Sequence, residues 1–306
     1  MDIIRVMGGL GNQLQQYALY RKFLAMGKEV RLDISWFTNA QVQDSVLAKR
    51  DLELKLFENL EMQTAAPEEI RAVLGRLYEE PEGFATKLRR KLKPDSNPVF
   101  TESGMYHPEI FQMEQKYLVG YWACDKYYAD VMEDIRKQLR FPVSSREENR
   151  RLVEELQKHG QVSVSVHIRR GDYLDSANRD LFGSICTDAY YNTAITYMKE
   201  RFPGAVFYLF SDDPVYVRAQ YPGEEYHVVD WNYGTDSFYD MQLMSQCTHN
   251  ICANSTFSFW GARLNENPAK IRIRPSIHKN TQVCIPEEMK GLWKGWTLIT
   301  PQGEIL

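Results

Sequence analysis

The chain has 306 residues, of which 43% are hydrophobic and 12% aromatic, so it can bury one or two substantial cores. This length favours about two domains of roughly 150 residues each. The formal net charge of −4 argues against nucleic acid as the main partner. Five scattered cysteines without a CxxC pair exclude the disulfide framework of a small secreted protein.

Nothing near the N-terminus predicts a targeting segment, because the chain enters a strand at Ile3 without a charged and then apolar stretch. No apolar run approaches the roughly 18 residues of a membrane span, so we expect a cytoplasmic protein. The basic run Lys87–Lys93 precedes Pro94 and is interpreted as a solvated helix end. The alternative is a weak peripheral contact with anionic lipid headgroups at the inner face of the membrane.

The first part of the chain opens as strand, glycine-rich loop, helix and strand, and becomes irregular and charged between residues 35 and 108. Pro142, followed by two serines, marks the expected boundary between domains 1–142 and 143–306. The elements predicted for the first domain are the strand Asp2–Met7, the helix Asn12–Met26, the strand Glu29–Asp33, short helices near Ala66–Leu77 and Gly83–Leu92, the strand Tyr117–Trp122 and a helix from about Asp125 to Arg140.

The second domain shows a regular alternation of strands and helices. Its predicted elements are the amphipathic helix Arg146–His159, the strand Val162–Ile168, the helix Ala189–Arg201, the strands Ala205–Phe210 and Tyr226–Asp230, the helix Ser237–Gln246, the strand Asn250–Ala253, the helix Phe257–Leu264 and a last strand, Lys270–Arg274. This alternation indicates a parallel sheet with right-handed crossovers. The predicted fold class is therefore α/β, with two Rossmann-like halves facing a cleft.

The strand Val162–Ile168 ends in a cluster of charges: Arg169, Arg170, Gly171 and Asp172. Ligands bind at the ends of strands in open α/β sheets, and guanidinium forks suit phosphate oxygens. Gly171 permits a tight backbone turn beside them. Asp172 either orients Arg169 or acts as a base on a substrate hydroxyl. The alternative is a solvated strand end with a surface ion pair of little energetic value.

A glycine-rich loop, Gly8–Gly11, separates the first strand from the first helix. It differs from a dinucleotide fingerprint because Leu14 stands where that motif requires glycine or alanine. The amides of the helix start still favour an anion or a sugar oxygen. Alternatively, Asn12 and Gln13 cap the helix and have no other role.

Two further strand-to-helix junctions resemble ligand loops. In Ser211–Pro214, the paired carboxylates suit a divalent ion, but Asp213 before proline also suits a helix start. We favour capping plus a contact to a ribose or base over a metal. In Asn254–Ala262, three small polar residues at a helix start form a donor-rich nest for phosphate oxygens. For Phe257 and Trp260, core packing is favoured over stacking on a flat ligand ring.

These motifs occur in a characteristic order, and together the sequence resembles the α-1,2-fucosyltransferases of glycosyltransferase family 11. The matching segments are Gly9–Gln13, His167–Tyr173, Phe210–Asp213, Asp240–His249 and Asn254–Ala262. The arginine motif is shared with α-1,6- and protein O-fucosyltransferases, and the combination is specific to the α-1,2 family. Phe259-Trp260 stands where many bacterial members have two tryptophans.

The resemblance implies a B-type glycosyltransferase fold, with residues 1–142 on the acceptor side and residues 143–306 binding the donor. It implies GDP-β-L-fucose as donor and co-substrate, a galactose-terminated oligosaccharide as acceptor, inversion at fucose C1, and neither metal nor cofactor. Family members from animals carry a signal anchor, so a bacterial cytoplasmic enzyme matches this chain better.

The site residues follow from the motifs and the resemblance together. Arg169 is expected to neutralise the departing diphosphate, and Asp172 is the candidate base by proximity, with Asp33, Asp175 and Asp188 as alternatives. The expected donor-binding residues are Gly9, Gly11, Asn12, Gln13, His167, Arg170, Ser211, Asp212, Asn254, Ser255, Thr256 and Phe257. Another fucosyl linkage, or a non-catalytic sugar-nucleotide binder, is the alternative function.

Overall fold

The computed structural model describes residues 1–46, 49–58, 60–78, 97–158, 160–174 and 176–306, which divide into two compact units, Met1–Arg140 and Phe141–Leu306. The predicted helix Gly83–Leu92, the basic run Lys87–Lys93 and Asp175 lie outside the described residues. In the described ranges no helix is both long and apolar enough to span a membrane.

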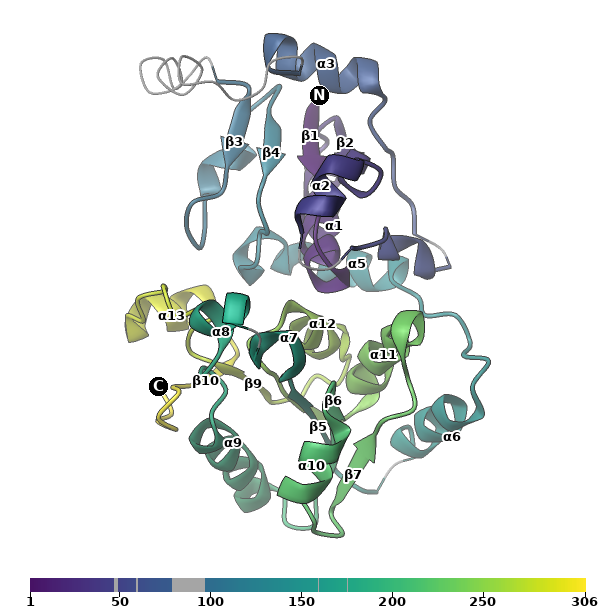
Figure 1. The fold of residues 1–306 in the computed structure, drawn as a ribbon, viewed down its shortest axis with the longest axis vertical. Coiled ribbons are helices and arrows are strands. Elements are labelled where there is room, and N and C mark those ends of the chain that lie inside the picture. The colour runs from purple at the N-terminus through teal and green to yellow at the C-terminus, as the bar shows by residue number, and fades with distance from the viewer. Residues whose placement is uncertain (47–48, 59, 79–96, 159, 175) are drawn as a thin grey trace. The chain divides into compact units, whose positions relative to one another are not determined.

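The N-terminal unit is built on a four-stranded parallel sheet with the order β2-β1-β4-β3 (Figure 1). The strands are β1 (Asp2–Arg5), β2 (Val30–Asp33), β3 (Val99–Thr101) and β4 (Tyr117–Val119). The central strand β1 pairs through Ile3 with Tyr117 and through Asp2 with Val30. Its residues Ile3 and Ile4 are completely buried, as expected for a strand covered on both faces.

Helices and 3-10 turns complete this unit. The helices are α1 (Leu10–Ala25), α2 (Ala40–Ser45), α3 (Pro67–Leu74) and α5 (Met132–Gln138), and the 3-10 turns are η1 (Ser35–Phe37), η2 (Glu53–Leu56), η3 (Gly75–Tyr78), η5 (Pro108–Phe111), η6 (Asp125–Tyr127) and η7 (Ala129–Val131). The long helix α1 corresponds to the predicted helix Asn12–Met26, and every residue from Gln13 to Tyr20 is buried, so the helix is covered on nearly all sides.

Two predictions for this unit were wrong in extent. The strand predicted to reach Trp122 ends at Val119. Trp122 takes a positive φ of 51°, which is not an extended strand conformation. Its backbone N–H donates to Glu102 Oε2 at 2.9 Å instead of pairing with a neighbouring strand. The helix predicted from Asp125 to Arg140 is interrupted, and only its last part, α5, is α-helical.

The C-terminal unit contains a six-stranded parallel sheet with the order β10-β9-β8-β5-β6-β7. The strands are β5 (Ser163–Ile168), β6 (Val206–Ser211), β7 (Tyr226–Val229), β8 (His249–Ile251), β9 (Arg272–Pro275) and β10 (Thr297–Ile299). In the centre, Ile168 of β5 is in register with Ser211 of β6, and Val166 is in register with Ile251 of β8. With one parallel sheet in each unit, the predicted α/β class of two Rossmann-like halves is confirmed.

Helices cover both faces of this sheet (Figure 1). They are α6 (Glu147–Leu156), α7 (Gly171–Leu174), α8 (Ser176–Phe182), α9 (Asp188–Arg201), α10 (Pro214–Gln220), α11 (Phe238–Gln246), α12 (Thr256–Leu264) and α13 (Pro286–Leu292), with the 3-10 turn η8 (Gly234–Ser237). On one face Val166 packs with Tyr190 and Met198 of α9, and on the other Phe210 packs with Leu243 and Met244 of α11. Alternate residues of the central strands therefore supply two cores.

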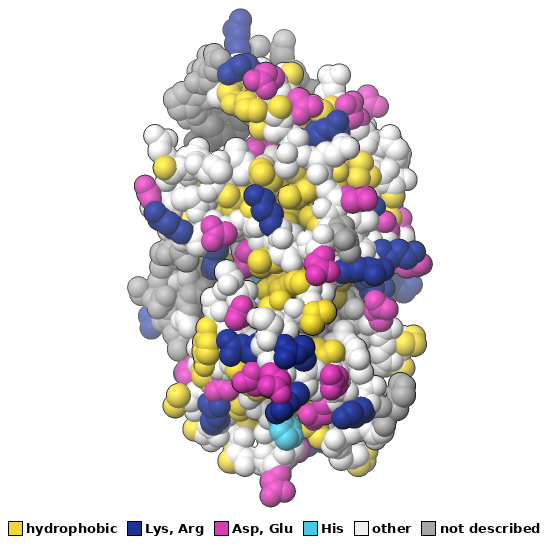
Figure 2. All heavy atoms as spheres, turned by 90° about the vertical axis from the view of Figure 1, so that its right-hand side faces the viewer, with side chains coloured by type: hydrophobic (Ala, Val, Ile, Leu, Met, Phe, Trp, Pro, Cys, Tyr) yellow, Lys and Arg dark blue, Asp and Glu magenta, His cyan; other side chains and the backbone are white. Residues whose placement is uncertain are grey.

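The strand predicted at Lys270–Arg274 is present as β9, but the prediction that it is the last strand was wrong. Helix α13 and strand β10 follow it, and β10 pairs with β9 at the sheet edge. Strand β10 was missed because its pairing with β9 is a contact between separate segments that no local pattern shows. On the outside of this unit, basic and acidic side chains are interspersed on the face that Figure 2 shows. That face therefore lacks the continuous basic stripe typical of a nucleic-acid-binding surface.

Candidate active site

The candidate site lies at the carboxyl edge of the C-terminal sheet, around the end of β5. The chain continues from β5 to β6 and β7 on one side, whereas β8 pairs with β5 on the other side. The strand order therefore reverses at β5, and such switch points are where open α/β sheets bind ligands. The polar residues predicted from the sequence follow β5, β6 and β8, so this topology brings three separate motifs to one edge.

Two arginines after β5 form ion pairs with two aspartates after β6. Arg169 Nη1 lies 3.0 Å from Asp212 Oδ2, and Arg170 Nε lies 3.1 Å from Asp213 Oδ2. The second oxygen of Asp212 accepts the backbone N–H of Arg170 at 2.9 Å. Both arginine side chains remain about 30% exposed, so they are held in place and still reach solvent. Partly exposed pairs of this kind stabilise a fold little, and here they orient the guanidinium groups.

Gly171 is required by the close approach of the two loops. A Cβ atom at this position would lie 2.6 Å from Asp212 Oδ2, well inside van der Waals contact. The sequence predicted a glycine for a tight backbone turn, and the structure gives a different reason, because any larger residue would displace the carboxylate that holds Arg169.

The junction after β6 acts as a helix cap and as an anchor for Arg170. Asp213 is the N-cap of α10 and accepts the Tyr216 N–H at 3.1 Å, with Pro214 at the first helical position, which confirms the predicted cap. This hydrogen bond, with the nearby Arg170 charge, lowers the pKa of Asp213. The Arg170 guanidinium lies 3.6 Å from the centre of the Tyr216 ring. Ser211 supports the loop, because its hydroxyl accepts the Asp213 N–H at 3.0 Å.

Within the part of the chain that the structure describes, no group of three or more histidine, cysteine, aspartate or glutamate side chains is placed to hold a metal ion. Asp212 and Asp213, the carboxylates considered for a metal, contact arginines instead. Metal independence itself stays a prediction.

His167, near the end of β5, presents a neutral imidazole next to Arg169. It is 6% exposed, and burial together with the Arg169 charge lowers its pKa to about 4. Its ring centre lies 5.9 Å from that of Phe257, and its Nδ1 has no hydrogen-bond partner among the described residues. A buried nitrogen without a protein partner is uncommon, and water or a ligand can supply the missing hydrogen bond.

The start of α12 supplies hydrogen-bond donors on the other side of the switch point. Ser255 is its N-cap without a side-chain cap, and the Ser255 and Thr256 hydroxyls are half-buried with no partner among the described residues. They stand beside the unpaired amides of the first helical turn, an arrangement that suits an anion. Trp260 is completely buried and Phe257 packs against the core of the α11 face, so the predicted core packing is confirmed.

Asn254 precedes this helix and holds the surrounding loops together. Its amide is 1% exposed and donates to the carbonyls of Phe182 at 3.0 Å and His278 at 3.2 Å. Its backbone carbonyl accepts the Tyr173 hydroxyl at 3.1 Å. The contacts of the Asn254 side chain are therefore structural, and they fix the approach to Ser255.

The N-terminal motif has a clear structural role within its own unit. Helix α1 begins at Leu10 with Gly9 as N-cap, so Asn12 and Gln13 lie inside the first turn and the alternative that they cap the helix was wrong. Gln13 is completely buried, and its Nε2 donates to the carbonyls of Gly8 at 2.8 Å and Asp51 at 2.9 Å.

Gln13 Oε1 also accepts two backbone N–H groups, from Glu53 at 2.9 Å and Leu54 at 3.3 Å. All four hydrogen-bonding positions of this amide are therefore occupied within the protein. The part that Gly9, Gly11, Asn12 and Gln13 play in donor binding stays a prediction.

The candidate bases have different surroundings. Asp172 lies in the short helix α7, and its side chain lies outside the described part of the structure, as does all of Asp175. Asp33 is buried and accepts hydrogen bonds from the Tyr117 hydroxyl and from the Ser35 N–H, which assigns it a structural role. Asp188 is exposed at the start of α9, 3.4 Å from the Tyr216 hydroxyl.

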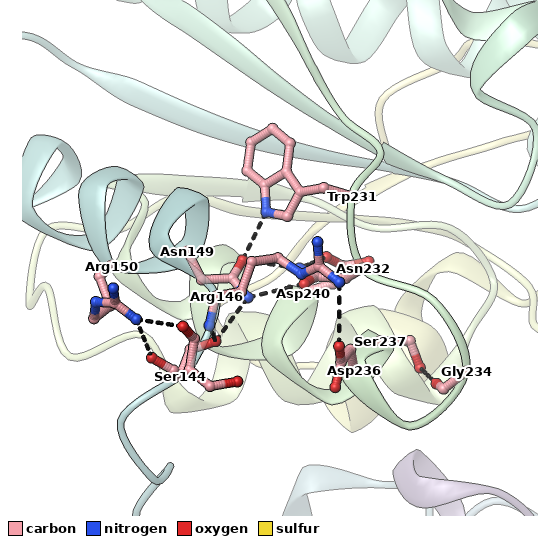
Figure 3. A network of polar contacts seen from close by, with 11 residues as sticks. Ser144, Arg146, Asn149, Arg150, Trp231, Asn232, Gly234, Asp236, Ser237 and Asp240 are labelled. Atoms are coloured by element: carbon pink, nitrogen blue, oxygen red, sulfur yellow. Dashed lines mark hydrogen bonds and ion pairs between the residues drawn. The ribbon is translucent and has the colours of Figure 1, made fainter.

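A polar network after β7 was missed in the sequence (Figure 3). At its centre the Asn149 and Asn232 amides bond to each other at 2.8 and 3.0 Å, and Asn149 also accepts from Trp231 Nε1 at 2.8 Å. Asn232 donates to Asp240 Oδ1 at 2.7 Å, and burial raises the pKa of Asp240 to about 7. The signal in the sequence was Asn232, a polar residue close behind the strand Tyr226–Asp230, because polar residues after strands also located the other loops.

A parallel α/β unit with cations and a donor-rich helix start at its switch point is the arrangement of proteins that bind anionic ligands. Comparison with known proteins gives the family. The family model described as glycosyl transferase family 11 matches residues 107–299. The chain therefore belongs to glycosyltransferase family 11.

Individual relatives show how far the similarity extends. The chain is 27% identical over 288 residues to an α-1,2-colitosyltransferase of Escherichia coli, covering 90% of this chain and 91% of the relative. It is 28% identical over 154 residues to galactoside α-(1,2)-fucosyltransferase 1 of Ateles belzebuth, covering 48% of this chain and 42% of that protein. Among solved structures, the NodZ α-1,6-fucosyltransferase soaked with GDP-fucose aligns with a TM-score of 0.44 and 15% sequence identity. The alignment covers 89% of this chain and 94% of the NodZ chain.

Proposed function

We propose that this glycosyltransferase transfers L-fucose from GDP-β-L-fucose to the 2-hydroxyl of a terminal β-galactoside, with inversion, forming an α-1,2 linkage. The observation that carries the proposal is the Arg169–Asp212 pair opposite the start of α12, at the point where the strand order of a family 11 chain reverses. Similarity to proteins named for α-1,2 transfer supports the linkage.

In this proposal the diphosphate lies between β5 and α12. Arg169 contacts its oxygens from one side, and the Ser255 and Thr256 hydroxyls with the first amides of α12 contact them from the other. His167 contributes a hydrogen bond without a charge, because its lowered pKa of about 4 leaves it neutral near pH 7. Positive charge and helix amides aimed at the leaving diphosphate replace a metal ion, and no cofactor is required.

The chemistry is a displacement at fucose C1. The galactose 2-oxygen forms a bond to C1 while the bond from C1 to the β-phosphate oxygen breaks, and the bonding electrons leave with GDP. Positive character develops at C1 and at the ring oxygen, and negative charge grows on the diphosphate next to Arg169. We assign Asp172 as the carboxylate that accepts the proton of the 2-hydroxyl.

A second donor is favoured by one specific comparison. The relative that matches over 90% of this chain is named a colitosyltransferase, so transfer of a colitosyl group in the same α-1,2 linkage is the second candidate. Transfer to another position of the acceptor is a further alternative, and so is binding of a sugar nucleotide without catalysis. The cytoplasmic location and the weak membrane contact expected from the sequence stay predictions.

One assay separates these functions. GDP-fucose and GDP-colitose are offered separately with a panel of galactose-terminated oligosaccharides, and GDP release is followed with and without each acceptor. The proposal expects galactoside-dependent release with GDP-fucose. NMR of the product assigns the linkage, and preference for GDP-colitose would establish the second candidate. Asp172→Asn tests the base, because loss of a proton acceptor lowers kcat while GDP affinity stays nearly intact.

A further inference from the structure

The turn that follows β4 holds a backbone conformation that a tryptophan rarely adopts. Trp122 has a φ of 51°, and its side chain is completely buried. The left-handed region favours glycine, and a bulky residue there is a genuine outlier. Such residues persist only where the surrounding structure holds them, and they cluster at functional sites. The segment Gly120–Trp122, here called the β4 turn, is therefore a candidate functional element of the N-terminal unit.

Glu102, one residue beyond β3, holds the β4 turn through its carboxylate. Oε2 accepts the backbone N–H of Tyr121 at 2.7 Å and that of Trp122 at 2.9 Å. Gly120 makes this approach possible, because a Cβ atom there would lie 2.6 Å from Glu102 Cβ and 2.9 Å from Oε2. The Tyr127 hydroxyl lies 3.4 Å from the other carboxylate oxygen. One carboxylate therefore satisfies two backbone donors that leave the sheet at the turn.

Helix α1 fixes the same turn from another side. Gln16 Nε2 donates to the carbonyl of Gly120 at 3.0 Å, and Gln16 Oε1 accepts the Met7 N–H at 3.0 Å. The Gln16 side chain is completely buried. The β4 turn is therefore tied to the segment after β1 as well as to the segment after β3, so its backbone is fixed before a ligand binds.

The β4 turn lies at the switch point of the N-terminal sheet. The chain continues from β1 to β2 on one side of β1, whereas β4 pairs with β1 on the other side (Figure 1). The strand order therefore reverses between β1 and β4. Open α/β sheets bind ligands at such points, beyond the carboxyl ends of the strands.

Tyr121 is the residue that the β4 turn presents to solvent. It is 49% exposed, although it stands between two buried residues, Gly120 and Trp122. The exposed ring offers a flat apolar face and a polar tip, which suits a ligand that has both C–H faces and hydroxyl groups. A ring on a fixed backbone loses less conformational freedom on binding than a ring on a mobile loop.

We propose that Glu102 is a positioning residue for the acceptor: it holds the β4 turn, and the turn presents Tyr121 as a contact that determines how tightly the acceptor binds. The inference rests on the proposed function, since it takes a galactoside as the acceptor. Glu102 acts through Tyr121 and exchanges no proton or bond with the substrate. Packing of Trp122 against Phe100 and Tyr127 accounts for the buried ring and leaves the exposed one without a role.

Steady-state kinetics with GDP-fucose and lactose test the Tyr121 contact. Tyr121→Ala is expected to raise the KM for lactose roughly tenfold, with kcat and GDP affinity within about twofold of the wild type, because the ring serves acceptor binding. Tyr121→Phe keeps the ring and should resemble the wild type. Tyr78→Ala removes another tyrosine of the same unit, 37% exposed, and is the matched control with an unchanged KM.

Variants of Glu102 test the support. Glu102→Ala should raise the KM for lactose to a similar extent, and the Tyr121 and Trp122 amides should lose protection from hydrogen exchange. Glu102→Gln should rescue both, because its amide oxygen can still accept two N–H groups. The double variant Glu102→Ala/Tyr121→Ala should have no higher KM than Tyr121→Ala, since no ring is left to position. Circular dichroism verifies that each variant is folded.

Either of two results overturns the positioning role alone: a lactose KM that Tyr121→Ala leaves unchanged, or effects of the two alanine variants that add in the double variant. Failure of the proposed function gives a different result, because lactose binding by saturation-transfer NMR needs no turnover. A wild type that binds lactose and releases no GDP contradicts the transfer reaction, and lactose affinity then replaces KM in the comparison of variants. A wild type that binds no galactoside overturns both.

Discussion

Arg169 and Asp212 form the contact that joins the ends of two neighbouring strands, with Nη1 and Oδ2 3.0 Å apart. The same carboxylate also accepts the backbone N–H of Arg170, so it fixes one arginine through its side chain and the other through its backbone. A guanidinium held before the ligand arrives loses less conformational entropy on binding. In the proposed function the pair therefore prepares the site for the diphosphate, and it adds little to the stability of the fold.

Asp212→Asn is expected to weaken GDP binding roughly tenfold and to lower kcat, because Arg169 loses its charged partner. The free energy of unfolding should change by only about 0–1 kcal/mol, as for a partly exposed ion pair. Asp213→Asn is the matched comparison, since asparagine preserves the α10 cap, and its effect on GDP binding should be smaller. Calorimetry and urea denaturation measure both quantities. Unchanged GDP affinity and turnover in Asp212→Asn would remove this carboxylate from the site.

Arg169→Lys is expected to lower kcat roughly 100-fold or more, because an ammonium group cannot reproduce the planar fork that, in the proposed function, faces the leaving diphosphate. Arg170→Lys should be milder, since that guanidinium packs on Tyr216 and pairs with Asp213. Steady-state kinetics with GDP-fucose compare the two variants. A folded Arg169→Lys protein with normal turnover would contradict a role in the transition state.

Gly171→Ala is expected to weaken GDP binding without a large loss of stability. The added Cβ would stand 2.6 Å from Asp212 Oδ2, so the carboxylate must move away from Arg169. Gly291→Ala in α13 is the control, because a Cβ there meets no atom within 4 Å and alanine favours a helix. Calorimetry with GDP separates the two substitutions. Equal affinity in both would show that the contact between Gly171 and Asp212 has no functional consequence.

Fucose transfer is expected to continue in excess EDTA. Arginines and the amides of a helix start can provide the positive field that a divalent ion supplies elsewhere. The measurement is the rate of GDP release with lactose, before and after chelation. If EDTA abolishes activity and Mg²⁺ or Mn²⁺ restores it, the reaction requires a metal ion. Asp212 and Asp213 would then be assigned as metal ligands during catalysis and not as arginine partners.

Asp240 should make stability depend on pH. Burial raises its pKa to about 7 in the folded protein, whereas an aspartate in the unfolded chain ionises near pH 4. The unfolded state therefore loses its proton first, and this residue lowers stability as the pH rises from about 4 to about 7.

The Asp240→Asn variant lacks this titrating group. The free energy of unfolding of the variant, minus that of the wild type, should therefore rise by up to about 1.4 kcal/mol per pH unit between about pH 4 and pH 7, and should stay constant above about pH 7. Urea denaturation at several pH values from 5 to 8 measures the difference. A difference that does not change with pH would show that Asp240 titrates alike in both states.

Much of the C-terminal site was predictable because strand ends are visible in sequence. The apolar run before Arg169 and the small residues from Asn254 onward located two loops, and parallel topology brought them to one edge. The partner of Arg169 was harder to predict, because proximity in sequence favoured Asp172, whereas Asp212 is 43 positions further along the chain. Pairing between loops depends on strand register, which no local pattern encodes.

Gln13 is a residue whose sequence motif did not reveal its structural contacts. Its position in a glycine-rich loop suggested a ligand contact, whereas its amide bonds to the segment from Asp51 to Leu54. A buried amide and a ligand-binding amide have the same sequence signature, and only long-range packing distinguishes them. Strand β10 was missed for a related reason, because its place beside β9 is also set by long-range pairing.

The most direct test of the central claim is the transfer reaction, with GDP-fucose as donor and lactose as acceptor. We predict GDP release that depends on lactose and a product whose NMR spectrum links fucose C1 to the galactose 2-oxygen. In Arg169→Lys the rate should fall by roughly 100-fold or more. A folded wild-type protein that releases no GDP with any galactoside, or an Arg169→Lys variant as active as the wild type, would contradict it.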